Sequence, residues 1–177
     1  MREAWKQPDL KSQCWMVGVG TAAELMLLAP SRWRAEACEH DPDDRAAIAR
    51  LVTHELVHVY HGQLNPRLEN DPDAMEPLGW LVEGLAVHVS GQLDDGHLAS
   101  AADAIRAGAA PAALAAAWSG KYRYGVSGSL VAFVDRTWGR AVLVALLRAQ
   151  SSDEVLARLG VREAELLSRW RASVVGP

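Results

Sequence analysis

Ten residues in the first half of the chain, 53–62, read THELVHVYHG and hold three histidines and one glutamate. His54 and His58 are four residues apart, so on a helix their imidazoles lie on one face, one turn apart. From there both rings can reach a single zinc ion at about 2.0–2.1 Å. Glu55 is offset by about 100° on the helix, where it can hydrogen-bond a metal-activated water without binding the metal. The spacing predicts two metal ligands, His54 and His58, and a general base, Glu55.

His61 lies on the same helical face, three residues after His58, and is the nearest alternative for a third ligand. Metzincins carry their third histidine six residues after the second, and that position here is Leu64. We therefore expect His61 to be a capping or surface histidine. A shuffled sequence of this composition shows the His-Glu-x-x-His pattern about once in eighty cases, so a metal site needs a further ligand elsewhere.

That further ligand is expected from an acid inside an apolar helix, because a buried unpaired carboxylate is costly. Glu83 fits this description, and Gly84 beside it allows close approach of another helix. Its neighbours are apolar: Trp80, Leu81, Val82, Leu85 and Val87. Glu76 is the competing acid but lies in a Pro-flanked stretch. The alternative is that Glu83 binds no metal and is instead paired with an arginine or exposed at a helix edge. Three ligands would leave zinc one open catalytic position.

Two segments together, HELVH at 54–58 and WLVEGLA at 80–86, resemble the gluzincin metallopeptidases, and especially the short peptidase MA-like families. The similarity extends over roughly residues 14–139. It implies a peptidase in which His54, His58 and Glu83 bind Zn²⁺. In thermolysin an aspartate four residues after the ligand glutamate orients a zinc histidine. That position here is Val87, so the residue that orients the histidines must come from elsewhere.

Amide hydrolysis also needs a donor for the developing oxyanion, and a tyrosine hydroxyl is suitable. The chain has three tyrosines, Tyr60, Tyr122 and Tyr124. In the resembling families a tyrosine begins a helix that ends in an aromatic-glycine pair, here Trp138-Gly139, and in the aminopeptidase branch it acts on the oxyanion. By position this role falls on Tyr124. Tyr122 and a packing role alone stay open as alternatives.

The elements that position these residues begin with a β-hairpin, expected over residues 14–19 and 24–28 and closed by Pro30. Such a strand beside the cleft is where gluzincins bind extended peptide through backbone groups. Capping residues 41–44 then start a helix of about five turns, which carries the two histidines and for which Gly62 offers a stop.

A polar loop is expected over residues 63–77, followed by the helix that carries Glu83 and ends near Gly91. The rest is Ala- and Leu-rich and helical, with segments at 97–107, 112–117, 124–138, 141–150 and 162–173. The fold class is therefore α+β: a minimal zincin-like fold, with residues 1–177 forming a single domain.

Composition and charge narrow the range of partners, locations and substrates that we expect. The 177 residues carry a net charge of −4 without a run of Lys or Arg, so we expect no nucleic-acid partner. No signal-peptide-like or membrane-spanning stretch is seen. Cys14 and Cys38 are expected to be free thiols in a reducing cytoplasm, with one disulfide between them as the alternative. We expect a cytoplasmic zinc peptidase acting on peptide or protein substrates. It should be endopeptidase-like, since the Gly-x-Met-Glu-Asn motif of aminopeptidases is not found. The alternative is a binding or regulatory module that keeps the scaffold and a structural zinc.

Overall fold

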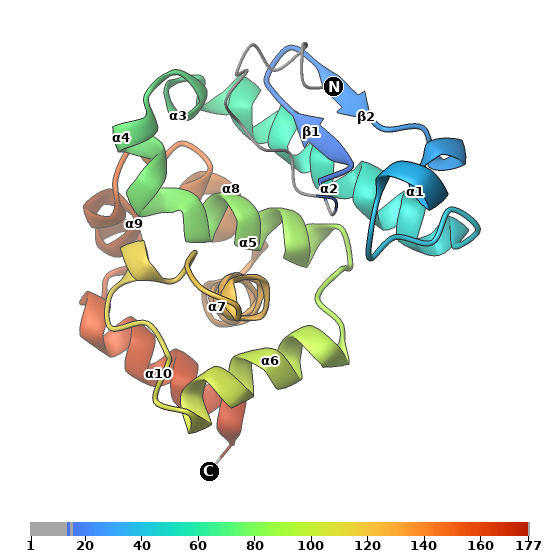
Figure 1. Ribbon diagram of the computed structural model, residues 1–177. Coiled ribbons are helices and arrows are strands. Elements are labelled where there is room, and N and C mark those ends of the chain that lie inside the picture. Colours follow the sequence, from blue (N-terminus) through green and yellow to red (C-terminus); the bar gives the residue numbers. More distant parts are fainter. Residues whose placement is uncertain (1–13, 15, 177) are drawn as a thin grey trace.

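The computed structural model describes residue 14 and residues 16–176, which form many helices and one two-stranded hairpin at the edge of the molecule (Figure 1). This arrangement confirms the α+β class. None of the described helices is long and apolar enough to cross a bilayer. In chain order the elements are β1 Gly18–Gly20, β2 Leu25–Leu27, α1 Pro30–Glu36, α2 Arg45–Leu64, α3 Arg67–Asn70, α4 Pro72–Met75, η1 Glu76–Leu78, α5 Gly79–Val89, α6 Asp95–Arg106, η2 Leu114–Ala116, α7 Arg123–Trp138, α8 Arg140–Leu146, α9 Ser152–Leu159 and α10 Glu163–Val175.

The predicted hairpin forms, with strands shorter than expected. Strands β1 and β2 pair antiparallel, with Val19 opposite Met26. Pro30 does more than end the second strand: it occupies the first turn of α1, where its missing N–H costs nothing, and this helix was not predicted. Trp33 of α1 is buried, and its indole N–H donates to the Leu28 carbonyl at 2.8 Å. The hairpin and α1 thus form one small unit on α2.

Cys14 and Cys38 are joined in a disulfide, so the expectation of free thiols is wrong. The Cys38 N–H also donates to the Cys14 carbonyl at 2.9 Å. The pairing joins the start of the hairpin to the segment after α1. Two cysteines 24 residues apart without a CxxC spacing give no sequence sign of such proximity, which depends on the path of the intervening chain.

Helix α2 begins as predicted and ends later than predicted. Asp44 caps it by accepting a hydrogen bond from the Ala47 N–H at 2.9 Å. Gly62 is buried inside the helix and does not end it. The helix ends at Leu64, and the buried side chain of Asn65, the next residue, donates to the carbonyls of Leu147 and Ala149 at 3.3 and 2.8 Å. The expected loop over residues 63–77 contains instead the short helices α3, α4 and η1.

Helix α5 lies between α2 and α7 and packs on both (Figure 1). A Cβ atom at Gly84 would stand 2.4 Å from the Ser127 carbonyl oxygen of α7, so only glycine permits this approach, as predicted. The main core extends from here into the C-terminal helices, and its largest fully buried side chains include Trp80, Leu81, Leu130, Leu166 and Trp170.

The C-terminal part is helical, with three departures from the expected segments. Residues 112–117 contain only the one-turn η2, and α8 stops at Leu146. Helix α9, capped by the Ser151 hydroxyl that accepts from the Glu154 N–H at 3.2 Å, was missed. Its Ser-x-x-Glu start is a capping-box pattern that is visible in the sequence.

Candidate metal centre and active site

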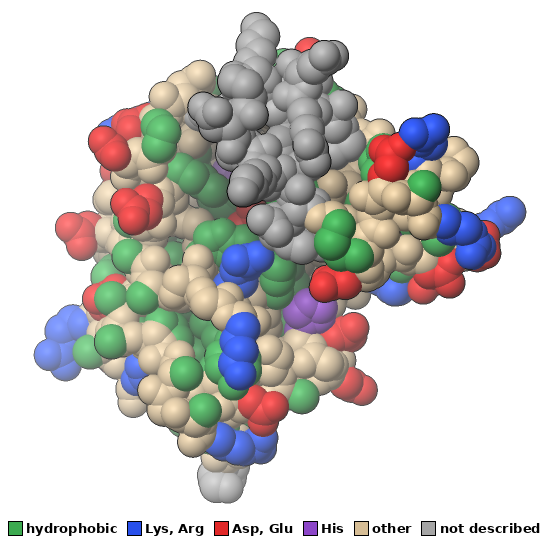
Figure 2. Space-filling view, viewed as in Figure 1, with side chains coloured by type: hydrophobic (Ala, Val, Ile, Leu, Met, Phe, Trp, Pro, Cys, Tyr) green, Lys and Arg blue, Asp and Glu red, His purple; other side chains and the backbone are tan. Residues whose placement is uncertain are grey.

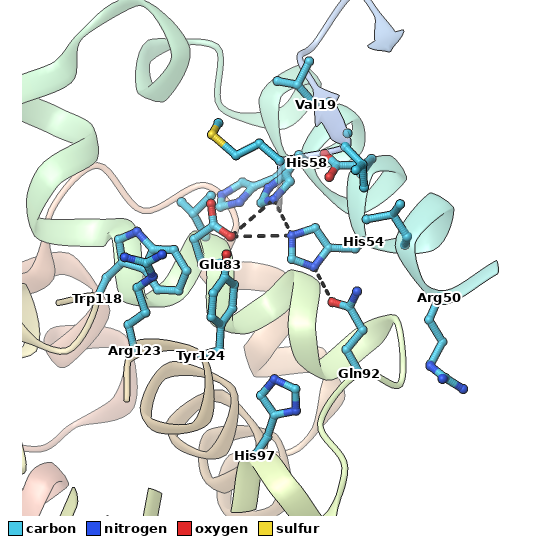
Figure 3. A pocket seen from close by; sticks show the side chains of 18 of the residues that line it. Val19, Arg50, His54, His58, Glu83, Gln92, His97, Trp118, Arg123 and Tyr124 are labelled. Atoms are coloured by element: carbon cyan, nitrogen blue, oxygen red, sulfur yellow. Dashed lines mark hydrogen bonds and ion pairs between the residues drawn. The ribbon is translucent and has the colours of Figure 1, made fainter. Parts of the chain in front are cut away.

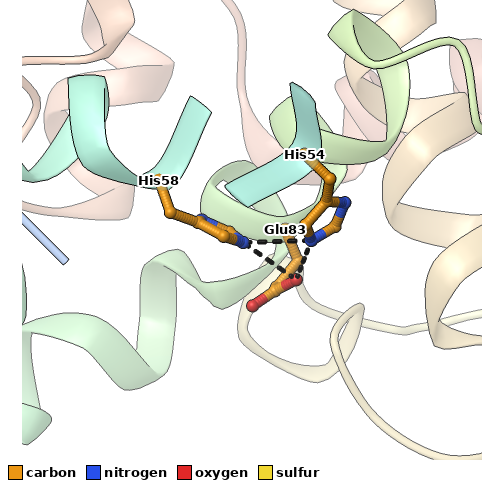
Figure 4. Close-up of side chains that lie close together, drawn as sticks. All are labelled: His54, His58 and Glu83. Atoms are coloured by element: carbon orange, nitrogen blue, oxygen red, sulfur yellow. Dashed lines mark hydrogen bonds and ion pairs between the residues drawn. The ribbon is translucent and has the colours of Figure 1, made fainter. Parts of the chain in front are cut away.

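Three side chains meet where α2 packs against α5: His54, His58 and Glu83 (Figure 4). The two Nε2 atoms are 3.1 Å apart, and Glu83 Oε2 lies 3.5 Å from His54 Nε2 and 3.6 Å from His58 Nε2. Ligands held at about 2.0–2.1 Å from one tetrahedral ion stand about 3.3 Å from each other. The triangle of donor atoms therefore has the size that a single small metal ion requires, and two imidazoles with one carboxylate are a donor set typical of zinc.

Of the two acids considered for the third ligand, the structure brings only Glu83 to the histidines. It projects from the middle of α5, which the apolar faces of neighbouring helices bury. Glu76 lies exposed in η1 and does not belong to the cluster.

Gln92 holds His54 in place, and sequence reasoning missed it. His54 Nδ1 lies 2.7 Å from the Gln92 amide oxygen, which can only accept, so Nδ1 donates and Nε2 is the nitrogen that faces the cluster and could bind a metal. The chain reaches this position by turning at Gly91, whose φ of 76° is in the left-handed region. The Gln92 N–H also donates to the Val87 carbonyl at 3.1 Å. Thirty-eight residues separate the partners, so no spacing rule signals the contact.

Replacing Gln92 with leucine should weaken zinc binding by about 10- to 100-fold, because the tautomer and orientation of His54 are then unsupported. Gln92→Glu, which keeps an acceptor and adds charge, should bind zinc at least as tightly as the unmodified protein. Competition titration with a chromophoric chelator measures both. Equal affinities for Gln92→Leu and the unmodified protein would contradict the assigned role.

The cluster is also electrostatically coupled. Burial alone would raise the pKa of Glu83, but the hydrogen bonds and charges of His54 and His58 lower that pKa to about 2. Burial alone would lower the pKa of His58, yet Glu83 and Glu55 raise it above its ordinary value. Without a metal, the cluster thus favours an anionic carboxylate facing a proton shared with the histidines, and a cation of higher charge can take that proton's place.

Glu55 lies on α2 under strand β1, beside the cluster. Burial raises the pKa of its carboxyl group above the ordinary value, the direction that a base acting near neutral pH needs. The Gly20 N–H donates a hydrogen bond to the carboxylate. A Cβ atom at Gly18 would stand 2.7 Å from Glu55 Oε1, and one at Gly20 would stand 2.1 Å from the Glu55 carbonyl oxygen. Two glycines therefore let the strand lie directly on the proposed base.

Of the three tyrosines, Tyr124 alone lines the cleft that contains the cluster (Figure 3). Burial and the nearby Glu83 carboxylate raise the pKa of its hydroxyl, which therefore stays protonated and able to donate at neutral pH. Tyr122 directly precedes α7, does not line this cleft and packs against the main core. Tyr60 is exposed on α2. The placement favours Tyr124 over Tyr122, as the sequence position did.

His61 is neither a ligand nor a surface residue, so the expectation of a capping or surface histidine is wrong. It is 3% exposed, and its Nε2–H donates to the Leu147 carbonyl at 3.1 Å. His61 is buried because the turn after α8, which includes Leu147 and Ala149, packs on the end of α2. Burial, with a smaller effect of His58, lowers the pKa of His61 to about 4.

This buried histidine should make stability pH-dependent. The unfolded chain binds a proton near the ordinary pKa of 6.5, while folded His61 does so only near 4. The free energy of unfolding should therefore fall as the pH drops through this window, by about 3 kcal/mol from this group. Denaturant unfolding of chelator-treated protein at pH 7 and pH 4 should show a loss smaller by about that amount in His61→Gln. An equal loss in both proteins would show that His61 titrates normally.

The cluster opens into a cleft of about 1070 Å³ (Figure 3). Residues 16–20, which include β1, line one wall, and residues of α2, α5 and the start of α7 line the others. Among the described residues, acidic and basic side chains are interspersed over the face shown in Figure 2. Strand β1, the cluster of His54, His58 and Glu83, and Glu55 thus all line the same cleft.

No protein-family model, curated protein or solved structure matches this chain.

Proposed function

We propose that the chain is a zinc-dependent peptidase with a minimal zincin-like fold, in which His54, His58 and Glu83 bind one Zn²⁺. One observation carries the proposal: the donor atoms of these residues form a triangle of the size that one tetrahedral ion requires. Glu55 stands beside it in the same cleft. Two nitrogens and one carboxylate oxygen favour zinc over magnesium or calcium, which prefer oxygen ligands alone.

Each residue has a distinct role in amide hydrolysis. A zinc ion bound here would lower the pKa of water and polarise the scissile carbonyl. Glu55 accepts the proton of the attacking water and passes it to the leaving nitrogen, which its raised pKa favours. The Tyr124 hydroxyl donates to the oxyanion. Gln92 keeps His54 in the ligating tautomer.

A polypeptide suits the cleft because β1 lies along one wall. Within the described part of the chain, β1 pairs with β2 only. A peptide in extended conformation can add to a strand edge through backbone hydrogen bonds, which fix its register over the metal cluster without needing particular side chains. An endopeptidase-like activity on peptide or protein substrates follows from this mode of binding.

The test is cleavage of a mixed-sequence peptide library, read by mass spectrometry. Zinc-loaded protein should cleave internal bonds, 1,10-phenanthroline should stop cleavage, and added zinc should restore it. Zinc-loaded, folded protein that cleaves nothing in the library would overturn the peptidase proposal.

The alternative, a binding module that keeps zinc structurally, fits the site less well. Structural zinc sites use four protein ligands, whereas catalytic sites use three and leave a position open. Among the described residues the cluster has three members. The short two-stranded sheet is the observation that favours the alternative. Stoichiometric zinc binding without cleavage in the library assay would support it.

A cytoplasmic location was expected partly from free thiols. Disulfides persist mainly in oxidising compartments, so the Cys14–Cys38 bridge weighs against a reducing cytoplasm. Thiol counting on protein isolated under alkylating conditions tests the location: two free thiols per chain would favour the cytoplasm, and none would favour an oxidising compartment.

A further inference from the structure

The Arg123 side chain lies against two aromatic rings in the cleft that contains His54, His58 and Glu83, called the metal cleft below. The rings of Trp118 and Tyr124 meet edge to face with centroids 4.8 Å apart. The guanidinium carbon of Arg123 lies 5.3 Å from each of these rings. Arg123 also hydrogen-bonds the Tyr124 side chain. Two aromatic faces and the phenol thus fix the position of a cation, which reduces the entropy lost when that cation binds an anion.

The segment of the chain that forms this wall contributes basic side chains and no acidic ones. Residues 118–124 read WSGKYRY, with Lys121 and Arg123 and no acid, and both cations line the cleft. The acids that line the cleft lie elsewhere: Glu55 and Glu83 at the metal cluster, and Glu39 and Asp94 on other segments. In Figure 3, Trp118 and Arg123 lie on one side of Glu83, while Gln92 and Arg50 lie on the other. Arg123 thus lies with Trp118 on one side of the cluster, while another cation of the cleft, Arg50, lies on the other side.

We infer that Arg123 binds a carboxylate of the substrate, one neighbouring the bond placed over the metal cluster. The inference rests on the proposed function and names its substrate class. A guanidinium presents a planar fork of N–H donors that matches a carboxylate, and partial burial strengthens such charge-assisted bonds. Arg123, Tyr124 and Glu83 line the same cleft, and Arg123 lies against the Tyr124 ring, so an anion bound by Arg123 would share the cleft with the bond to be cleaved. Two sources supply this group: an Asp or Glu side chain, or the carboxyl terminus of a short peptide.

The test measures binding rather than turnover, in zinc-loaded Glu55→Gln. Calorimetric titration compares two matched pairs of peptides: an internal Glu against Gln, both with amidated ends, and a free carboxyl terminus against its amide. At least one anionic member should bind about 10- to 100-fold tighter than its neutral partner, as expected for a hydrogen bond to a charged group. The pair that shows the preference identifies the source of the carboxylate.

Added to this background, Arg123→Met should remove the preference while the neutral peptides bind within about threefold of their original affinity. Arg123→Glu should favour peptides with Lys in place of the internal Glu. Arg136→Met is the matched control, since Arg136 lies on the same helix and stacks on Phe133 at 5.8 Å but does not line the cleft. It should leave the preference intact. If Arg123→Met folds poorly, Arg123→Gln makes the same comparison.

Two results would overturn the inference. One is equal affinity within both peptide pairs in the parent protein. The other is an equal loss for anionic and neutral peptides in Arg123→Met, which would mean that Arg123 only positions Tyr124. Neither result depends on turnover, so failure of the peptidase proposal is recorded separately, as lack of cleavage in the library assay.

Discussion

Glu55→Gln should lower turnover of any peptide substrate by at least about 10²–10⁴, to the limit of detection, while zinc content and fold are unchanged. Glutamine keeps the shape and the hydrogen-bond acceptor but cannot take a proton from water. The carboxylate is not part of the cluster of metal-ligand atoms, so the metal should stay. Turnover, zinc content and thermal unfolding of the same preparation measure the three quantities together.

The matched control is Glu76→Gln, which makes the same chemical change at an exposed acid in η1. It should leave turnover unaltered. Hydrolysis retained at the original rate in Glu55→Gln would show that another group transfers the proton and that the proposed mechanism is wrong. Loss of zinc in this variant would instead place Glu55 among the ligands.

Tyr124→Phe should slow turnover by about 10²–10³, the usual cost of losing one oxyanion donor. The hydroxyl acts mainly on charge that develops in the transition state, so substrate affinity should change little. The raised pKa of Tyr124 keeps the proton on the hydroxyl through the neutral range, and the effect should persist across that range. Steady-state kinetics at several pH values separate the change in kcat from any change in KM.

Tyr122→Phe is the paired control, since Tyr122 packs against the main core and does not line the metal cleft. Near-normal turnover with a small loss of stability is expected for it. A large loss of turnover in Tyr122→Phe alone would move the oxyanion role to that residue. Normal turnover in Tyr124→Phe would leave Tyr124 a packing residue.

The sequence was informative where the candidate site depends on local periodicity. Spacing of four on a helix with a clear N-cap placed His54 and His58 on one face, and an acid in an apolar helix singled out Glu83. Gly84 next to that acid predicted the close approach of another helix, which the structure identifies as α7. Each of these signals lies within one helix of the chain and can therefore be recognised without knowing the tertiary structure.

The sequence was uninformative where contacts join distant segments. Gln92 contacts His54 although 38 residues separate them in the sequence. The Leu147 carbonyl that accepts a hydrogen bond from His61 is 86 residues away from it. Helix α2 passes Gly62 because packing against the turn after α8 outweighs a weak local preference. The Cys14–Cys38 pairing depends in the same way on the path of the chain between its ends.

Zinc stoichiometry is the most direct test of the central claim that His54, His58 and Glu83 share one ion. Protein dialysed to equilibrium at a fixed free zinc concentration is analysed by mass spectrometry for metal per chain. About one zinc per chain is expected in the unmodified protein and in Glu76→Ala, and close to none in Glu83→Ala at the same free zinc. A Glu83→Ala protein that holds zinc as fully as the unmodified chain, or an unmodified chain that holds none at saturating zinc, would contradict the assignment.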